Sequence, residues 1–194
     1  MVDSIKQSTH ALIKSKGISD REPSTTSIAR HAGISVGSLY QYFSTREAIF
    51  LALYEDTSTE VVVTMKKVAV RILNQPLEKG VAEIVRYLLD LHRQHELILL
   101  GLVRQIPELK LASQPMSYEN MIFDSIRIAV KQWVPELSPH DLNRRAFFLR
   151  EIMLSGIYRY LNDRPEDISD REFIADMTAI VGFYIAHGPV TKRR

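Results

Sequence analysis

Apolar residues recur three and four positions apart along most of the chain, which is the spacing of helices that bury one face. Beyond residue 50 no segment alternates apolar and polar residues as a half-buried strand does. The pattern, with the prolines that interrupt it, predicts helices near residues 5–17, 25–32, 36–43, 45–74, 77–95, 97–105, 116–133, 138–161 and 169–187. The sequence therefore predicts an all-α protein.

Residues 24–50 contain three helix starts in quick succession. A residue that can cap a helix N-terminus precedes each one: Ser24 or Thr25, then Ser35, then Ser44 or Thr45. Gly33 ends the first of these helices, because glycine tolerates the left-handed backbone found there. Glu47 lies in the first turn of the third, where a carboxylate suits the helix dipole. Connections this short predict a helix–turn–helix arrangement.

The middle helix of this segment has two unlike faces. At 100° per residue its apolar side chains, Val36, Leu39 and Phe43, fall together. The other side carries small residues, an amide and two phenols: Ser35, Gly37, Ser38, Tyr40, Gln41 and Tyr42. A glutamine can pair with an adenine edge in the major groove, and flanking hydroxyls can reach the phosphates on either side. This face predicts DNA binding.

An ordinary three-helix packing unit is the alternative, because tyrosines are often half-buried and small residues often lie at helix crossings. The predicted contacts with DNA also include Thr25 as a phosphate donor and Arg46 as a positive charge near the backbone. The full predicted set is Ser24, Thr25, Ser35, Val36, Gly37, Ser38, Tyr40, Gln41, Tyr42 and Arg46.

Residues 25–47 read Thr-x-x-Ile-Ala-x-x-Ala-Gly-Ile-Ser-x-Gly-x-Leu-Tyr-x-Tyr-Phe-x-x-Arg-Glu. This long pattern resembles the tetracycline-repressor (TetR) family of transcriptional regulators. The resemblance implies a DNA-binding domain at residues 1–48 and a helical ligand-binding and dimerisation domain at residues 49–194. Thr9 and His10 depart from the small or apolar residues usual in the family, and the segment 17–25 is about two residues longer, which predicts a looser first helix and a surface bulge.

A second motif overlaps the first. Residues 33–37 read Gly-Ile-Ser-Val-Gly and match the Gly-x-Ser-x-Gly of hydrolases. That motif needs a buried strand before the serine, whereas the preceding residues have helical spacing. An all-helical enzyme and a helical adaptor that binds protein remain as alternative functions, but no catalytic residue is assigned.

Composition limits the remaining possibilities. The chain has 194 residues, 45% of them hydrophobic, and a formal net charge of +2. Residues 1–55 contain six Lys and Arg against five Asp and Glu, a balance of +1, so DNA affinity must come from a few placed contacts. There is no cysteine, signal peptide or long apolar span, which fits a cytoplasmic protein with no membrane partner.

The last two predicted helices are apolar over more than one face, so each must be buried on two sides. One side packs within the chain and the other predicts a partner. Residues 156, 179 and 182 are small enough for close approach. The resemblance implies a homodimer joined by a four-helix bundle. The predicted dimer residues are Phe148, Ile152, Gly156, Tyr160, Met177, Val181 and Tyr184. The alternative is that both faces are covered within one chain.

The family resemblance also implies a pocket for a small-molecule effector among the middle helices. The candidates are apolar or aromatic and are predicted to face inward: Tyr87, Leu91, Tyr118, Met121, Ile122, Phe123, Ile126 and Trp133. The three with a polar group on an aromatic ring, Trp133, Tyr118 and Tyr87, rank first. Any helical core contains such residues, so ordinary core packing is the alternative.

A metal or cofactor is not expected. His92 and His95 share a helix face at the spacing of metal ligands, but no third ligand accompanies them, and surface histidines are the simpler interpretation. The sequence thus predicts a homodimeric, ligand-responsive regulator, most simply a repressor, whose partners are a double-stranded, pseudo-palindromic DNA operator and an apolar or aromatic effector of unknown identity.

Overall fold

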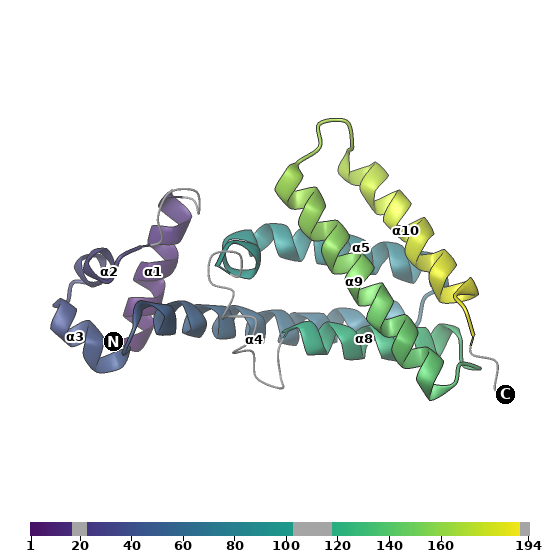
Figure 1. The fold of residues 1–194 in the computed structure, drawn as a ribbon, viewed down its shortest axis with the longest axis horizontal. Helices are drawn as coiled ribbons and strands as arrows, with labels where there is room; N and C mark the ends of the chain where they lie inside the picture. Colours follow the sequence, from purple (N-terminus) through teal and green to yellow (C-terminus); the bar gives the residue numbers. More distant parts are fainter. Residues whose placement is uncertain (17–22, 103–117, 191–194) are drawn as a thin grey trace. The chain divides into compact units, whose positions relative to one another are not determined.

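The computed structural model describes residues 1–16, 23–102 and 118–190, and every regular element in these ranges is helical (Figure 1). The elements are α1 (Val2–Lys16), α2 (Thr25–His31), α3 (Val36–Tyr42), α4 (Arg46–Leu73), α5 (Leu77–Gln94), the π-helix η1 (Glu96–Leu102), α8 (Tyr118–Trp133), α9 (Pro139–Asp163) and α10 (Asp170–His187). The all-α prediction is confirmed. Within the described ranges no helix combines the length and apolarity that a membrane span requires.

The chain divides into two compact units. The first contains Met1–Glu60 and η1, and the second contains Val61–Gln94 and the described residues from Tyr118 onward. Helix α4 begins in the first unit and ends in the second. The predicted boundary between residues 48 and 49 separates a DNA-binding domain from a ligand-binding and dimerisation domain. It stays a prediction, because a division into compact units does not test which residues carry each function.

The first unit is built around a small apolar core shared by α1, α2, α3 and the start of α4. Its fully or nearly buried members are Ile5, Ile28, Ala29, Leu39, Phe43 and Ile49. Thr9 is also fully buried, and its hydroxyl donates to the carbonyl of Ile5 at 2.8 Å. Helix α1 therefore runs without interruption through this polar residue. The predicted bulge falls largely on residues 17–22, which lie outside the described ranges.

The predicted caps fix the turns between α2, α3 and α4. The hydroxyls of Ser24, Ser35 and Thr45 accept hydrogen bonds from the backbone N–H three residues later, at 3.2, 3.0 and 3.1 Å. Gly33 adopts φ +70° just after α2, a conformation that glycine reaches without strain. These local interactions confirm the predicted starts and the stop of the segment.

In the second unit, α10 packs against α5 and α9, and α8 packs against α9. Ser138 caps α9, with Pro139 in its first turn, as the sequence predicts. Ser169 caps α10 and forms a reciprocal capping box with Glu172, whose side chain accepts from the Ser169 backbone at 2.9 Å. The long C-terminal helices therefore begin at defined points.

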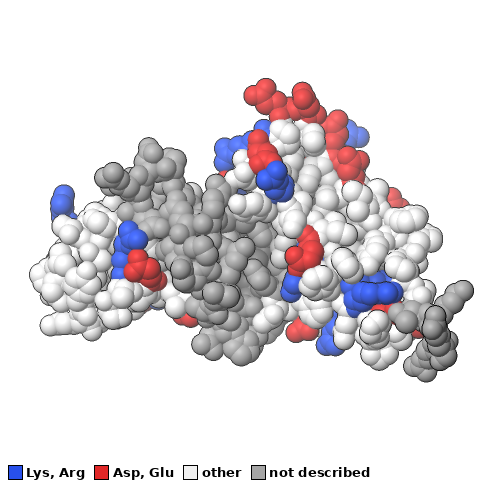
Figure 2. All heavy atoms as spheres, in the orientation of Figure 1, with Lys and Arg blue, Asp and Glu red and all other residues white. Residues whose placement is uncertain are grey.

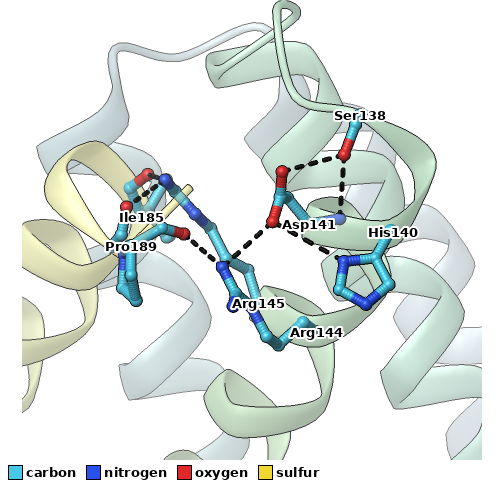
Figure 3. A network of polar contacts seen from close by, with 8 residues as sticks. Ser138, His140, Asp141, Arg144, Arg145, Ile185 and Pro189 are labelled. Carbon is cyan, nitrogen blue, oxygen red and sulfur yellow. Dashed lines mark hydrogen bonds and ion pairs between the residues drawn. The ribbon is translucent and has the colours of Figure 1, made fainter. Parts of the chain in front are cut away.

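A buried arginine ties α9 to the end of α10 (Figure 3). Arg145 is only 2% exposed, and its guanidinium donates to the backbone carbonyls of Ile185 and Gly188. Those carbonyls lie in and just after the last turn of α10, where helix geometry leaves them without partners. The arginine thus satisfies the C-terminus of one helix from the interior of its neighbour.

An aspartate organises the other side of the same contact (Figure 3). Asp141, 1% exposed, accepts from the Ser138 hydroxyl at 2.8 Å and from Arg144 at 3.0 Å. Arg144 in turn donates to the carbonyl of Pro189. The beginning of α9 and the end of α10 are held together by this network.

Candidate functional site

The exposed face of α3 presents polar, uncharged side chains. Tyr40 and Tyr42 are 49% and 48% exposed, and Gln41 between them is exposed as well. Leu39 on the opposite side is fully buried in the core and fixes the orientation of the helix. No charged residue occurs within α3, and the view over α2 and α3 in Figure 2 is largely free of charged side chains.

Neighbouring hydroxyls extend this face. The Thr25 hydroxyl lies 3.5 Å from that of Tyr40, so α2 and α3 bring two phosphate-donor candidates together. The hydroxyls of Ser35 and Ser38 are 2.8 Å apart, and Ser35 also caps α3. A Cβ atom added at Gly37 would meet only the Ser35 hydroxyl, at 3.7 Å, so the backbone here is open to an approaching surface.

Two predicted contact residues have structural tasks in the free protein. Val36 packs partly against the apolar core, so only part of its side chain is left to contact DNA. Ser24 holds the N-terminus of α2 through its hydroxyl. Their assigned contacts with DNA therefore remain predictions that depend on backbone atoms or on the remaining exposed surface.

Arg46 supplies the positive charge at the start of α4. Its guanidinium lies 3.0 Å from the Glu47 carboxylate and 5.7 Å from the centre of the Phe50 ring. The backbone N–H of Glu47 donates a hydrogen bond to the Glu47 carboxylate and lowers the pKa of that carboxyl, and Arg46 lowers this pKa further. A phosphate would have to compete with this ionised carboxylate for the arginine.

This arrangement of side chains is the one expected of a helix that enters a DNA major groove. A central amide and a hydroxyl face outward, with phenols beside them and an arginine at the next helix. Amides read base edges, whereas hydroxyls and cations bind phosphate and set the register. The sequence predicted these residues, and the structure brings Thr25, Tyr40, Gln41 and Tyr42 onto one exposed region of the first unit.

The second unit contains an apolar cavity of about 490 Å³ between α4, α5 and α8. This volume falls within the roughly 300–1,000 Å³ of small-molecule sites. Its walls are almost wholly apolar, and one lining residue, Tyr87, has a buried hydroxyl with no hydrogen-bond partner among the described residues. Burial raises the pKa of this phenol, so it stays protonated and can donate.

Four of the predicted pocket residues line the cavity: Tyr87, Met121, Ile122 and Ile126. Leu91 and Phe123 do not line it, and the side chain of Tyr118 lies outside the described part. Trp133, which ranked first, is placed elsewhere: its ring packs on Gly80 and its N–H donates to the Gln75 carbonyl at 3.1 Å. The glycine leaves room for the indole, so Trp133 fills core space.

Several wall residues come from the last turns of α4 and were not predicted, including Met65, Val68, Ala69, Ile72 and Leu73. The apolar spacing of α4 gave their helix but did not distinguish a cavity wall from a packed interface. Burial alone cannot make that distinction, because both environments exclude water.

An apolar surface remains uncovered on α9 and α10. Phe147 and Phe148 are both 47% exposed, and Ile180 and Phe183 are 53% and 68% exposed. Phe147 and Phe148 meet edge to face at 5.4 Å. Figure 2 shows a broad uncharged area over these helices, with acidic side chains toward the turn that joins them. Exposed aromatic side chains gathered in this way are typical of an interaction surface.

The predicted dimer residues are distributed differently. Phe148 is exposed, and Ile152, Gly156 and Tyr184 are half-buried. Met177 and Val181 are 6% and 2% exposed, so they are already buried within the chain. The exposed positions that the predicted list left out are Phe147, Ile180 and Phe183. Phe183 was missed because Val181, Tyr184 and Ile185 beside it already satisfied the helical spacing.

Tyr160, another predicted dimer residue, belongs to a contact within the chain. Its hydroxyl donates to the Asp170 carboxylate at 2.8 Å, and its ring stacks on Phe173 at 4.2 Å. Arg93 of α5 donates to both oxygens of the same carboxylate at 2.8 Å. Arg93 first, and Tyr160 second, lower the pKa of Asp170. This clasp joins α5, α9 and α10.

Residues 8–53 match the family model of the bacterial regulatory proteins of the tetR family. The match covers the whole of α2 and α3 with their caps and the uncharged face. Residues 8–53 therefore form a DNA-binding domain of the tetR family. The chain is a DNA-binding transcriptional regulator, a class of protein without enzymatic activity. A comparison with curated proteins found no match.

Solved structures share the fold along nearly the whole regulator. A protein of Mesorhizobium loti MAFF303099 assigned to the TetR family is 20% identical, with TM-score 0.70 and 95% of each chain covered. The repressor FadR of Thermus thermophilus, in complex with lauroyl-CoA, is 15% identical, with TM-score 0.66, 100% of this chain and 97% of that chain. RolR in complex with resorcinol is 20% identical, with TM-score 0.62 and coverage of 98% and 95%.

The regulator's structure also explains the competing motifs. Residues 33–37 form the turn into α3, and Ser35 uses its hydroxyl to cap that helix, with no strand before it in the described residues 23–34.

The expectation that His92 lies at the surface is wrong. The residue is 3% exposed, and its ring Nδ1 lies 2.7 Å from the Leu88 carbonyl oxygen. Burial lowers the pKa of His95. The described ranges contain no cluster of three side chains suited to a metal.

Proposed function

We propose that this TetR-family protein is a homodimeric repressor that an apolar small molecule releases from a pseudo-palindromic operator. The observation that carries the proposal is the exposed, uncharged face of α3, with Gln41 between two phenols. Gln41 reads a base edge, and Tyr40, Tyr42 and Thr25 bind phosphates on either side. Such a regulator works in the cytoplasm, where a bacterial protein meets its operator.

Dimerisation through α9 and α10 supplies the second reading helix. Phe147, Phe148, Ile180 and Phe183 of one chain pack against the same residues of a second copy, as a two-fold interface requires. Gly182 has nothing within 4 Å of where its side chain would be, which lets the helices approach closely. The dimer reads two half-sites about one helical turn apart, roughly 34–36 Å, or a multiple of that distance.

The cavity between α4, α5 and α8 is the proposed effector site. Its apolar walls favour a lipophilic or aromatic molecule, and the unpartnered Tyr87 hydroxyl favours one with a hydrogen-bond acceptor. Two proteins of the same fold support this range of ligands, since one was solved with lauroyl-CoA and the other with resorcinol. The effector releases DNA only if it binds the non-reading state more tightly than the reading state.

A gel-shift titration on the promoter beside the protein's own gene tests the central claim. We expect a salt-sensitive complex that prefers this promoter over unrelated DNA. Gly37→Trp adds a bulky ring to the exposed side of α3, where an added Cβ would meet only the Ser35 hydroxyl at 3.7 Å, and is expected to abolish the complex. Gln132→Trp, at an exposed position on α8, is the control and should bind normally. A folded dimer with no sequence preference at any salt concentration contradicts the proposal.

A further inference from the structure

A polar hollow of about 470 Å³ lies beside the apolar cavity, on a different stripe of α5. Its residues on α5 recur at helical spacing: Lys79, Ala82, Glu83, Arg86, Tyr87 and Asp90. The end of α4 completes it with Arg71 and Gln75. Tyr87 belongs to both the hollow and the cavity, so the two spaces meet at this one side chain.

The hollow has an excess of positive charge. Glu83 is already neutralised, because Arg71 forms an ion pair with it and the Gln75 amide donates to it. Lys79 and Arg86 are exposed and form no ion pair with any residue that the structure describes, and the lining of the hollow contains one further carboxylate, that of Asp90. The local balance is therefore about one positive charge, open to solvent and available to an anion.

The cavity has the opposite preference. The one charged side chain in its wall is Asp124, which lies 3.7 Å from Arg127 and is largely exposed. An anionic group placed there would meet a carboxylate, whereas an anionic group beside Tyr87 would meet two unpaired cations and a buried phenol that lacks an acceptor. Charge and hydrogen bonding both favour the Tyr87 side.

We propose that the effector is an anionic amphiphile, with its apolar chain in the cavity and its carboxylate or phosphate in the hollow formed by Lys79 and Arg86, next to the Tyr87 hydroxyl. This inference rests on the proposed effector site and specifies its chemistry. The head group accepts a hydrogen bond from Tyr87 and is attracted by the two cations. A neutral molecule of the same length gains only the apolar part of this interaction.

Calorimetric titration of the full-length protein with three probes of equal chain length tests the proposal. The probes are 1-dodecanol, kept below its solubility limit, and dodecanoate and dodecyl phosphate, each kept below its micelle concentration. We expect both anions to bind about five- to tenfold more tightly than the alcohol, with a preference that weakens as salt is added. The dodecanoate and phosphate arms distinguish the two kinds of head group.

Three variants locate the head group and the chain of the bound probe. Lys79→Ala/Arg86→Ala removes the unpaired cations and should bring the anions to the affinity of the alcohol, whose own binding is unchanged. Lys67→Ala/Arg159→Ala removes the same charge from exposed positions outside the hollow and should keep the preference. Ala129→Phe fills the cavity from its wall and should weaken all three probes.

The outcomes separate this inference from the proposed function. Equal binding of alcohol and anions, or a preference that survives Lys79→Ala/Arg86→Ala, overturns the anionic head group and leaves the apolar effector site standing. Binding of anions that Ala129→Phe does not affect also overturns it, because the chain then lies elsewhere. If none of the three probes binds, the apolar effector of the proposed function fails as well, while operator binding remains a separate measurement.

Discussion

Two exposed faces of this protein differ in chemistry. The face of α3 carries an amide, hydroxyls and two half-exposed phenols, whereas the face shared by α9 and α10 carries exposed phenylalanines and an isoleucine. Water solvates the first face well, so the protein loses little when that face is unbound. Each exposed phenylalanine on the second face leaves apolar area in contact with water, which disfavours the uncovered state.

This difference indicates different lifetimes for the two contacts. A polar face exchanges hydrogen bonds with water for hydrogen bonds with DNA, so a modest change in fit can release it. An apolar face that is well packed on a second copy separates only with a large loss of burial. The proposed regulator needs both, because the proposed dimer must persist while its contact with DNA is made and broken.

The largest expected effect comes from a charge on the apolar face. Phe183 is 68% exposed, and Phe183→Asp loses its burial twice in a two-fold dimer and adds two opposed carboxylates. We expect the dimer dissociation constant to rise by roughly a hundredfold or more, measured by analytical ultracentrifugation. Operator affinity should fall with it, although each copy stays folded.

Val63→Asp is the matched control, because Val63 is 52% exposed on α4 and receives the same charge. It should leave the dimer unchanged if the α9 and α10 surface is the interface. Equal effects of the two substitutions on the dimer, or a Phe183→Asp protein that remains dimeric, would show that the apolar face of α9 and α10 is ordinary exposed surface and not the dimer interface.

A smaller effect is expected on the polar face. Gln41→Ala should cost about 1–3 kcal/mol and relax the preference at one base pair, because it removes the proposed base contact. Tyr42→Phe should weaken binding to all sequences alike, by about 0.5–1.5 kcal/mol, since it removes a phosphate donor. Competition binding against operators with single base changes separates the two patterns. An unchanged base preference in Gln41→Ala would show that the amide does not read sequence.

The two faces also differ in how far the sequence predicted them. The α3 face follows from local rules, since caps at Ser24, Ser35 and Thr45 and the turn at Gly33 fix its helices within a few residues. The α9 and α10 face depends on which apolar side chains the rest of the chain already covers. Met177 and Phe183 are both apolar, yet one is buried and the other exposed.

The cavity shows the same limit. Tyr87 and Trp133 are both aromatic residues with a polar group, and the sequence ranked both as pocket residues. Gly80 receives the ring of Trp133 and Gln75 receives its N–H, while the hydroxyl of Tyr87 has no partner. Which polar group is satisfied depends on contacts between distant helices, and helical spacing carries no information about those contacts.

The smallest expected effect tests whether the apolar face depends on surface ion pairs. Arg93 and Asp170 are 44% and 48% exposed, so solvent screens their interaction, and Arg93→Ala should lower the free energy of unfolding by about 0.5–1 kcal/mol.

Asp170 has a lowered pKa in the folded protein, chiefly because of Arg93. Its contribution is therefore present above the ordinary carboxyl pKa and is lost as pH falls through the lowered value. Urea unfolding across this acid range should show that the free energies of unfolding of the native and Arg93→Ala proteins converge.

Arg159→Ala, which breaks a pair with Asp163 inside α9, is the control for losing one arginine without loosening α5 from α10. A constant difference between the native and Arg93→Ala proteins down to low pH would contradict the ionic origin. Loss of the dimer in Arg93→Ala would mean that the clasp, and not core packing, holds the apolar face in place.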